Sequence, residues 1–191
     1  MIERASLLTL EAYARQRNEF RAKVIEHKKR RAVHLGEHVT LQFEDELTIR
    51  YQVQEMLRIE RIFEDEGIEG ELQAYNPLVP DGGNWKATML IEYPDEAERR
   101  TMLAQLKGIE KRAWVQAAGA ERVYAIADED LERENEDKTS SVHFLRFELP
   151  QPVRASLRSG ASLSIGVDHP RYSASTQAVP EVRAALVADL T

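Results

Sequence analysis

The sequence contains no cysteine among its 191 residues. This absence excludes disulfide bonds, thiolate metal sites and a cysteine nucleophile, and it is typical of a cytoplasmic protein. No apolar run is long enough to span a bilayer. The N-terminal stretch MIERASLLTLEAYARQRNEF is charged and lacks the apolar segment of a signal peptide. We therefore expect a cytoplasmic protein without a membrane partner.

Other absences narrow the class of protein. There is no glycine-rich phosphate-binding motif, no alternation of strands and helices typical of a doubly wound sheet, and no internal repeat. The formal net charge of −7 argues against non-specific nucleic-acid binding. The basic run at residues 27–31 ends a predicted helix, where cations complement the helix dipole. A content of 42% hydrophobic and 31% charged residues is ordinary for one soluble globular domain.

Residue patterns predict an α+β fold. Alternating apolar and polar residues predict strands at 39–44 and 141–149, and residues 112–127 predict an antiparallel hairpin that turns at Gly119. We expect a mainly antiparallel sheet of about five to six strands, packed around a central buried helix at 46–66 with flanking helices. Residues 1–175 are expected to form one domain, followed at 176–191 by a loosely attached amphipathic helix. The charge-dense segment 128–138 is expected to be a solvated loop or short helix.

The predicted helix at 46–66 carries an anomaly. Apolar residues cover well over half of its circumference, which indicates burial on most sides, yet Glu55 and Glu60 lie within this arc. A buried charge without a partner is costly, so each carboxylate either meets a cation or lines a cavity. Arg58 is the nearest candidate partner of Glu55. A structural ion pair and a ligand or metal pocket both fit this pattern. Gly67 is expected to end the helix.

The segment AYNPLVPDGGNWK, residues 74–86, is rich in turn-forming residues. It offers a polar and aromatic set that suits the binding of a small ligand. These candidate residues are Asn76, Asp81, Asn84, Trp85 and Lys86. The alternative interpretation is a well-formed turn in which Asn and Asp bond their own backbone and Trp85 belongs to the core.

Two histidines and two charged residues complete the candidate set. His143 falls on the apolar side of its predicted strand, and Arg146 falls on the other side. His169 follows Asp168 at the end of another strand, where binding sites are often built. If both histidines reached Glu55, the three side chains could hold iron or zinc. No local ligand spacing supports that site, and burial of His143 in the core is the competing interpretation.

Five segments resemble the bacterial family catalogued as domain of unknown function 3501. They are YQVQEMLRIERIF from Tyr51, AYNPLVPDGGNWKAT from Ala74, VYAIADEDLER from Val123, KTSSVHFLRFEL from Lys138 and GVDHPRY from Gly166. The resemblance spans nearly the whole chain. It implies a single-domain bacterial protein whose gene neighbours encode rubrerythrin-like and iron–sulfur oxidoreductase proteins. It transfers no functional residue, because no activity is established for the family.

Three functions therefore stand as hypotheses. The leading one is an accessory or binding protein, in a redox or iron-metabolism system, that recognises a small ligand or a partner protein through residues 74–86 and the strand end at 166–170. The second is a metalloprotein or enzyme that uses Glu55, His143 and His169. The third is a purely structural interaction protein. Its expected oligomeric state is a monomer or a small homo-oligomer.

Overall fold

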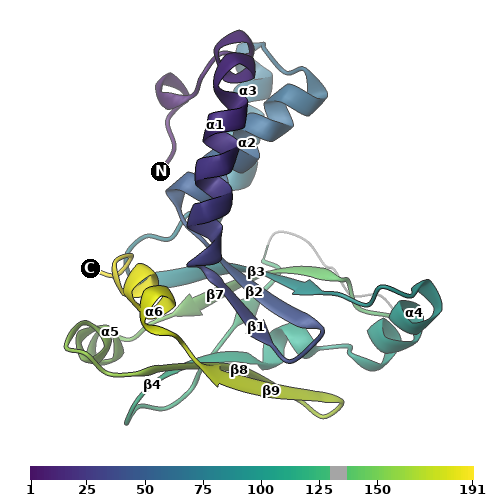
Figure 1. Cartoon of the computed structure of the whole chain (residues 1–191), viewed down its shortest axis with the longest axis vertical. Helices are drawn as coiled ribbons and strands as arrows, with labels where there is room; N and C mark the ends of the chain where they lie inside the picture. Colours follow the sequence, from purple (N-terminus) through teal and green to yellow (C-terminus); the bar gives the residue numbers. More distant parts are fainter. Residues whose placement is uncertain (130–136) are drawn as a thin grey trace.

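The computed structural model describes residues 1–129 and 137–191 (Figure 1). Its α-helices are α1 (Leu10–Lys29), α2 (Glu46–Glu60), α3 (Asp65–Tyr75), α4 (Glu96–Gln105), α5 (Gln151–Arg158) and α6 (Pro180–Val187). Its short 3-10 helices are η1 (Arg4–Ser6), η2 (Asn76–Leu78) and η3 (Ile109–Arg112). Its strands are β1 (Ala32–Leu35), β2 (Val39–Glu44), β3 (Asn84–Ile91), β4 (Ala113–Ala117), β5 (Val123–Tyr124), β6 (Ile126–Ala127), β7 (Val142–Glu148), β8 (Leu163–His169) and β9 (Tyr172–Gln177).

The described strands form two antiparallel sheets. Sheet A has the order β1-β2-β3-β7-β6, and sheet B has the order β5-β4-β8-β9. Successive side chains of a strand point to opposite faces, so each sheet has an inner and an outer face. The inner faces bury one continuous apolar core that includes Phe43, Trp85, Phe147 and Ile165. The α+β class and the mainly antiparallel pairing predicted from the sequence are confirmed.

The C-terminal helix α6 belongs to this core, although we expected it to be loosely attached. Val182 and Leu186 are buried there, and the indole Nε1–H of Trp85 donates to the Leu186 carbonyl over 2.8 Å. Strand β9, at the expected start of this helix, pairs with β8 along its whole length. The expected boundary between residues 175 and 176 therefore falls inside a strand.

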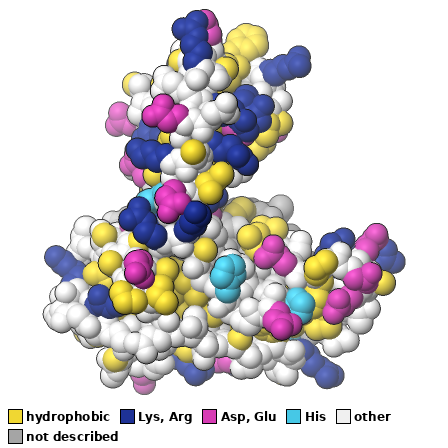
Figure 2. Space-filling model, viewed as in Figure 1, with side chains coloured by type: hydrophobic (Ala, Val, Ile, Leu, Met, Phe, Trp, Pro, Cys, Tyr) yellow, Lys and Arg dark blue, Asp and Glu magenta, His cyan; other side chains and the backbone are white. Residues whose placement is uncertain are grey.

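Helices α1, α2 and α3 form a lobe that stands on the outer face of sheet A (Figure 1). The lobe has its own apolar core, made by Ile2, Ile49, Val53, Leu57 and Leu72. Figure 2 shows many Lys and Arg side chains on this lobe, whereas acidic side chains gather around α4. The lobe is therefore a second layer, and the face of it seen in this view is rich in Lys and Arg.

The helix predicted at 46–66 differs from the structure in length and place. It ends at Glu60, where Arg61 adopts the left-handed conformation with φ 56°, so Gly67 does not end it. Ile59 and Phe63 are 58% and 71% exposed. The sheets pack on each other and not around this helix, and its apolar arc is shared between the lobe core and solvent. At its N-terminus, Asp45 forms a capping box with Thr48.

The lobe and the sheets are joined through a buried cation. Arg31 is 2% exposed and donates from Nε to the Phe43 carbonyl (3.1 Å) and from Nη2 to the Glu44 carbonyl (3.1 Å). It also pairs with Asp189, at the C-terminal end, and with Asp45, at the start of α2. Burial raises the pKa of the Asp189 carboxyl despite this pairing. One guanidinium thus connects α1, β2, α2 and the C-terminus.

The hairpin expected at 112–127 is only partly as predicted. Strand β4 pairs with β5 antiparallel, with Trp114 opposite Tyr124. Ile126 and Ala127 instead pair with β7 in sheet A. The chain therefore crosses between the sheets at Ala125, which sequence alternation alone does not reveal. The segment expected as a solvated loop, 128–138, lies largely outside the described residues. None of the described helices is long and apolar enough to cross a membrane.

Candidate functional site

The outer face of sheet A carries a row of charged side chains. Antiparallel register places Glu44 of β2 opposite Lys86 of β3, and Lys86 opposite Arg146 of β7. Directly opposed residues share a face and lie close together, so the three side chains form a row across the sheet. Asn84 and Glu148 form the next pair, joined by a 3.1 Å hydrogen bond from the amide. Two predicted site residues, Lys86 and Arg146, are therefore neighbours.

A groove of about 230 Å³ lies over this row, and we call it the strand groove. One wall is the 3-10 turn η2, which supplies Pro77 and Leu78. The floor is formed by strands β3 and β7. The residues that line the groove are Pro77, Leu78, Lys86, Glu129, Phe144, Leu145 and Arg146. Its walls are mostly apolar and include three charged side chains, Lys86, Glu129 and Arg146, which is the usual composition of a ligand site.

A second hollow of about 270 Å³ adjoins the strand groove, since both are lined by Leu78 and Phe144. It lies where the lobe meets sheet A. Its other lining residues are Lys28, Gln42, Glu44, Ile49, Gln52, Tyr75, Thr88, Leu90 and Val142. Glu44 is not free in this hollow, because it accepts hydrogen bonds from Thr48 and from Thr88 (2.7 Å).

Arg146 is the neutralised cation of the strand groove. Glu129 accepts from its Nε over 2.7 Å and from its Nη2 over 2.6 Å, and Glu148 accepts from its Nη1. This two-bond carboxylate geometry is strong and directional. These hydrogen bonds raise the pKa of Arg146 further and lower the pKa of Glu129. Arg146 therefore has little charge left for a ligand.

Lys86 is the opposite case. It is partly buried, and among the described residues its amine makes no hydrogen bond or close ion pair. Burial lowers the pKa of Lys86, and the neighbouring positive charge of Arg146 lowers it further, while Glu129, Glu148 and Asp81 act weakly in the other direction. Desolvation and a neighbouring cation both disfavour the charged form of a lysine. Such a lysine is stabilised either by binding an anion or by losing its proton.

The other loop candidates have structural roles. Asp81 accepts from the Gly83 N–H (2.8 Å), and the Asp81 N–H donates to Asn84 Oδ1 (3.3 Å), so these side chains shape the turn. Asn76 clamps Ile2, accepting from its N–H (2.8 Å) and donating to its carbonyl (3.0 Å). Trp85 is on the inner face and 1% exposed. Of the five loop candidates, Lys86 alone lines the strand groove.

Glu55 has the structural ion-pair role that was one of its two interpretations. Its carboxylate accepts from Arg17 Nε (2.8 Å) and Nη2 (2.9 Å), from the Tyr13 hydroxyl (2.6 Å) and from Arg58 (3.2 Å). These donors, Arg17 first, lower its pKa to about 2. The network ties α1 to α2 inside the lobe. Glu60, the other acid of the predicted arc, is exposed.

The proposed metal site of Glu55, His143 and His169 is not assembled. His143 is fully buried on the inner face of sheet A, with Nδ1 2.5 Å from Asp128 and Nε2 2.9 Å from Thr139. His169 ends β8 in sheet B, with Nε2 3.0 Å from the Lys107 carbonyl. Glu55 lies in the lobe. Within residues 1–129 and 137–191, no group of His, Asp and Glu could hold a metal ion.

Asp168 is enclosed by a separate surface cluster on sheet B. Arg112 Nε lies 2.8 Å and Arg122 Nη1 2.9 Å from its carboxylate, and the Tyr124 hydroxyl donates over 2.6 Å. The Arg122 guanidinium also lies 4.0 Å from the ring centroid of Trp114. Both hydrogen bonds go to Oδ2, whereas Oδ1 has, among the described residues, only the ion pair with Arg112, and the cluster links β4, β5 and β8.

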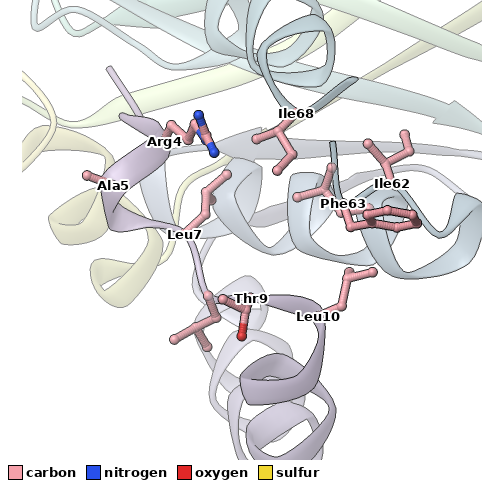
Figure 3. Close-up of a pocket in the computed structure, with 10 residues that line it drawn as sticks. Arg4, Ala5, Leu7, Thr9, Leu10, Ile62, Phe63 and Ile68 are labelled. Atoms are coloured by element: carbon pink, nitrogen blue, oxygen red, sulfur yellow. The ribbon is translucent and has the colours of Figure 1, made fainter. Parts of the chain in front are cut away.

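The lobe carries a larger groove of about 660 Å³. Figure 3 shows Leu7 and Leu10 of the N-terminal segment facing Ile62, Phe63 and Ile68. Its one charged lining residue, Arg4, is paired with Asp65. The lining of this groove has no unpaired cation among the described residues, so the strand groove is the better candidate for an anionic ligand.

Sequence reasoning missed several groove residues. Leu78 and Phe144 are ordinary apolar residues, and only tertiary packing brings η2 over β7. Glu129 belongs to the charge-dense segment 128–138, which the sequence predicts to be a solvated loop or short helix. The signal that was present is the alternation that places Phe144 and Arg146 on the same side of a strand.

The fold and the groove define an α+β protein with two antiparallel sheets, a helical lobe and a small cationic groove between them. Comparison with known proteins identifies it further. The chain belongs to the family described as "Protein of unknown function (DUF3501)", which matches residues 1–190 and confirms the resemblance. It is also similar to a solved structure, a novel protein of unknown function from Burkholderia pseudomallei K96243. The two are 57% identical, with a TM-score of 0.95, over 100% of this chain and 99% of that chain. None of the curated proteins compared with the chain matches it.

Proposed function

We propose that this protein binds a small organic acid in the strand groove, with the carboxylate of the acid paired to Lys86. The observation that carries the proposal is the partly buried Lys86 amine, which has no hydrogen bond or close ion pair among the described residues and faces mostly apolar walls. A bound carboxylate would supply the missing counter-charge and restore the favourable charged state of the lysine.

The dimensions of the site limit the ligand. The strand groove and its neighbour have volumes of about 230 and 270 Å³. Pockets for drug-sized molecules span roughly 300–1,000 Å³. The ligand is therefore a short molecule, with an apolar body against Leu78 and Phe144 and its acid at the Lys86 end.

This proposal narrows the binding hypothesis drawn from the sequence. The redox and iron-metabolism context, and rubrerythrin-like or iron–sulfur partners, rest on the family resemblance and stay predictions. The binding of a small acid is compatible with that context but does not depend on it.

The test is a titration with hexanoate, followed by isothermal calorimetry and by amide chemical shifts. Lys86→Met should weaken binding about tenfold or more, because a charge-assisted hydrogen bond contributes roughly 1.5–3 kcal/mol. Lys23→Met is the matched control, since Lys23 is exposed on α1 and outside the groove. Equal binding by the two variants, or no binding by the native protein, would refute the proposal. Lys86→Met should fold normally, because it removes a poorly solvated charge.

A further inference from the structure

We propose that Lys86 is an amine nucleophile that forms a reversible imine with the carbonyl of a small 2-oxo acid held in the strand groove. This inference rests on the proposed function and deepens it, because it names the class of acid. A 2-oxo acid carries its carbonyl next to its carboxylate, so the ion pair between this carboxylate and charged Lys86 also brings the carbonyl to the amine, and the fraction of Lys86 that is neutral attacks it.

The first step of the argument is the state of the amine. Only a neutral amine attacks a carbonyl, and an ordinary lysine is almost entirely charged at neutral pH. Enzymes obtain a neutral lysine by desolvation or by a neighbouring cation. Burial is the larger influence on Lys86, which lines the groove with Leu78 and Phe144. Arg146, directly opposite in the register, acts in the same direction, while Glu129 and Glu148, which pair with Arg146, oppose it.

The second step concerns the acids that face Lys86. From β2, Glu44 is opposite Lys86, but its carboxylate is held by Thr48 and Thr88. From β7, Glu148 is bonded to Arg146 and Asn84. Glu129 is bound by Arg146 through two hydrogen bonds. These three carboxylates are thus engaged elsewhere, and Asp81 accepts a hydrogen bond from the Gly83 N–H, so none of the described acids forms a close ion pair with the amine.

The third step is the chemistry, which needs no oxidant or reductant. The Lys86 nitrogen lone pair forms a bond to the carbonyl carbon, and the carbonyl oxygen takes up a proton to give a carbinolamine. Loss of the hydroxyl as water, with the remaining nitrogen proton, leaves a carbon–nitrogen double bond. Addition of water reverses the sequence.

The experiment uses two acids of equal chain length, 2-oxohexanoate and hexanoate, each incubated with the whole protein at neutral pH. Sodium borohydride then delivers hydride to any imine carbon and fixes it as a stable secondary amine. Intact-mass measurement should show addition of one molecule of the 2-oxo acid, and peptide mapping should place it on Lys86. Hexanoate, which has no carbonyl, should give no adduct.

Three variants make the result decisive. Lys86→Met should abolish the adduct, and Lys86→Arg should also abolish it while keeping a positive charge. Lys23→Met should leave the yield unchanged. Hexanoate binding without any adduct on Lys86 would overturn the imine and leave the proposed function standing. An adduct on Lys86 without hexanoate binding would support the imine and refute acid binding in general. Adducts spread equally over exposed lysines such as Lys111 would overturn the imine.

Discussion

Replacing Glu55 by Gln should lower the free energy of unfolding by about 2 kcal/mol at pH 7, if the carboxylate fastens α1 to α2 as described. The side chain is 13% exposed and receives two hydrogen bonds from Arg17, one from Tyr13 and one from Arg58. The amide of Gln keeps the shape of the side chain and loses its charge. The change therefore removes the ion pairs with little effect on packing.

The magnitude follows from the pKa of Glu55, which these donors lower from 4.5 to about 2. A difference of this size corresponds to roughly 3 kcal/mol of preference for the charged form in the folded protein. Side chains of Arg17 and Arg58 are 30% and 38% exposed, so water screens part of this interaction. We therefore expect about two thirds of the full value.

The dependence on pH has a defined sign. Because the pKa of Glu55 is lower in the folded protein, its contribution to stability is complete above pH 4.5 and is lost as the pH falls towards 2. The difference in stability between the native protein and Glu55→Gln should therefore shrink on acidification.

The assay is urea denaturation followed by circular dichroism at pH 7 and at pH 4, with Glu60→Gln as the control. Glu60 is on the same helix, is exposed, and forms no hydrogen bond or ion pair that the structure records, so its replacement should change stability by less than about 0.5 kcal/mol. Equal effects of the two replacements, or a Glu55→Gln effect that grows towards low pH, would refute the ion-pair reasoning.

Two further replacements test the packing. Gly166→Ala should destabilise the protein by about 1–3 kcal/mol, because a Cβ there would lie 2.4 Å from the Trp114 ring and 2.9 Å from a backbone carbonyl of β9. Urea denaturation measures this change, and an unchanged free energy of unfolding would contradict the prediction. Arg31→Met should lower the free energy of unfolding by about 3 kcal/mol or more, because it leaves the charges of Asp189 and Asp45 without their cation where the lobe meets the sheets. Thermal melting measures this loss, and it should be smaller when Asp189→Asn is added.

Several elements were predictable because they depend on neighbours in the chain. The alternation that predicts strands at 39–44 and 141–149 is a local feature, and the structure confirms both strands as β2 and β7. The end of α2 was not predictable in this way. Arg61 adopts the left-handed conformation, which costs a non-glycine residue energy that only surrounding packing can offset. Sequence rules favour a glycine as the residue that ends a helix, and therefore predicted an end at Gly67.

The sequence by itself determined the α+β class, the strands at 39–44 and 141–149, and the alternation that puts Arg146 on the side of its strand opposite His143. Only the tertiary structure decided that Glu55 meets Arg17, that His143 and His169 lie in different sheets, and that η2 covers Lys86. The physical reason is the distance along the chain over which each interaction acts. Periodicity and capping act over a few residues, whereas pairing across sheets and between helices depends on which long-range arrangement buries the most apolar surface at the least cost in unpaired charge.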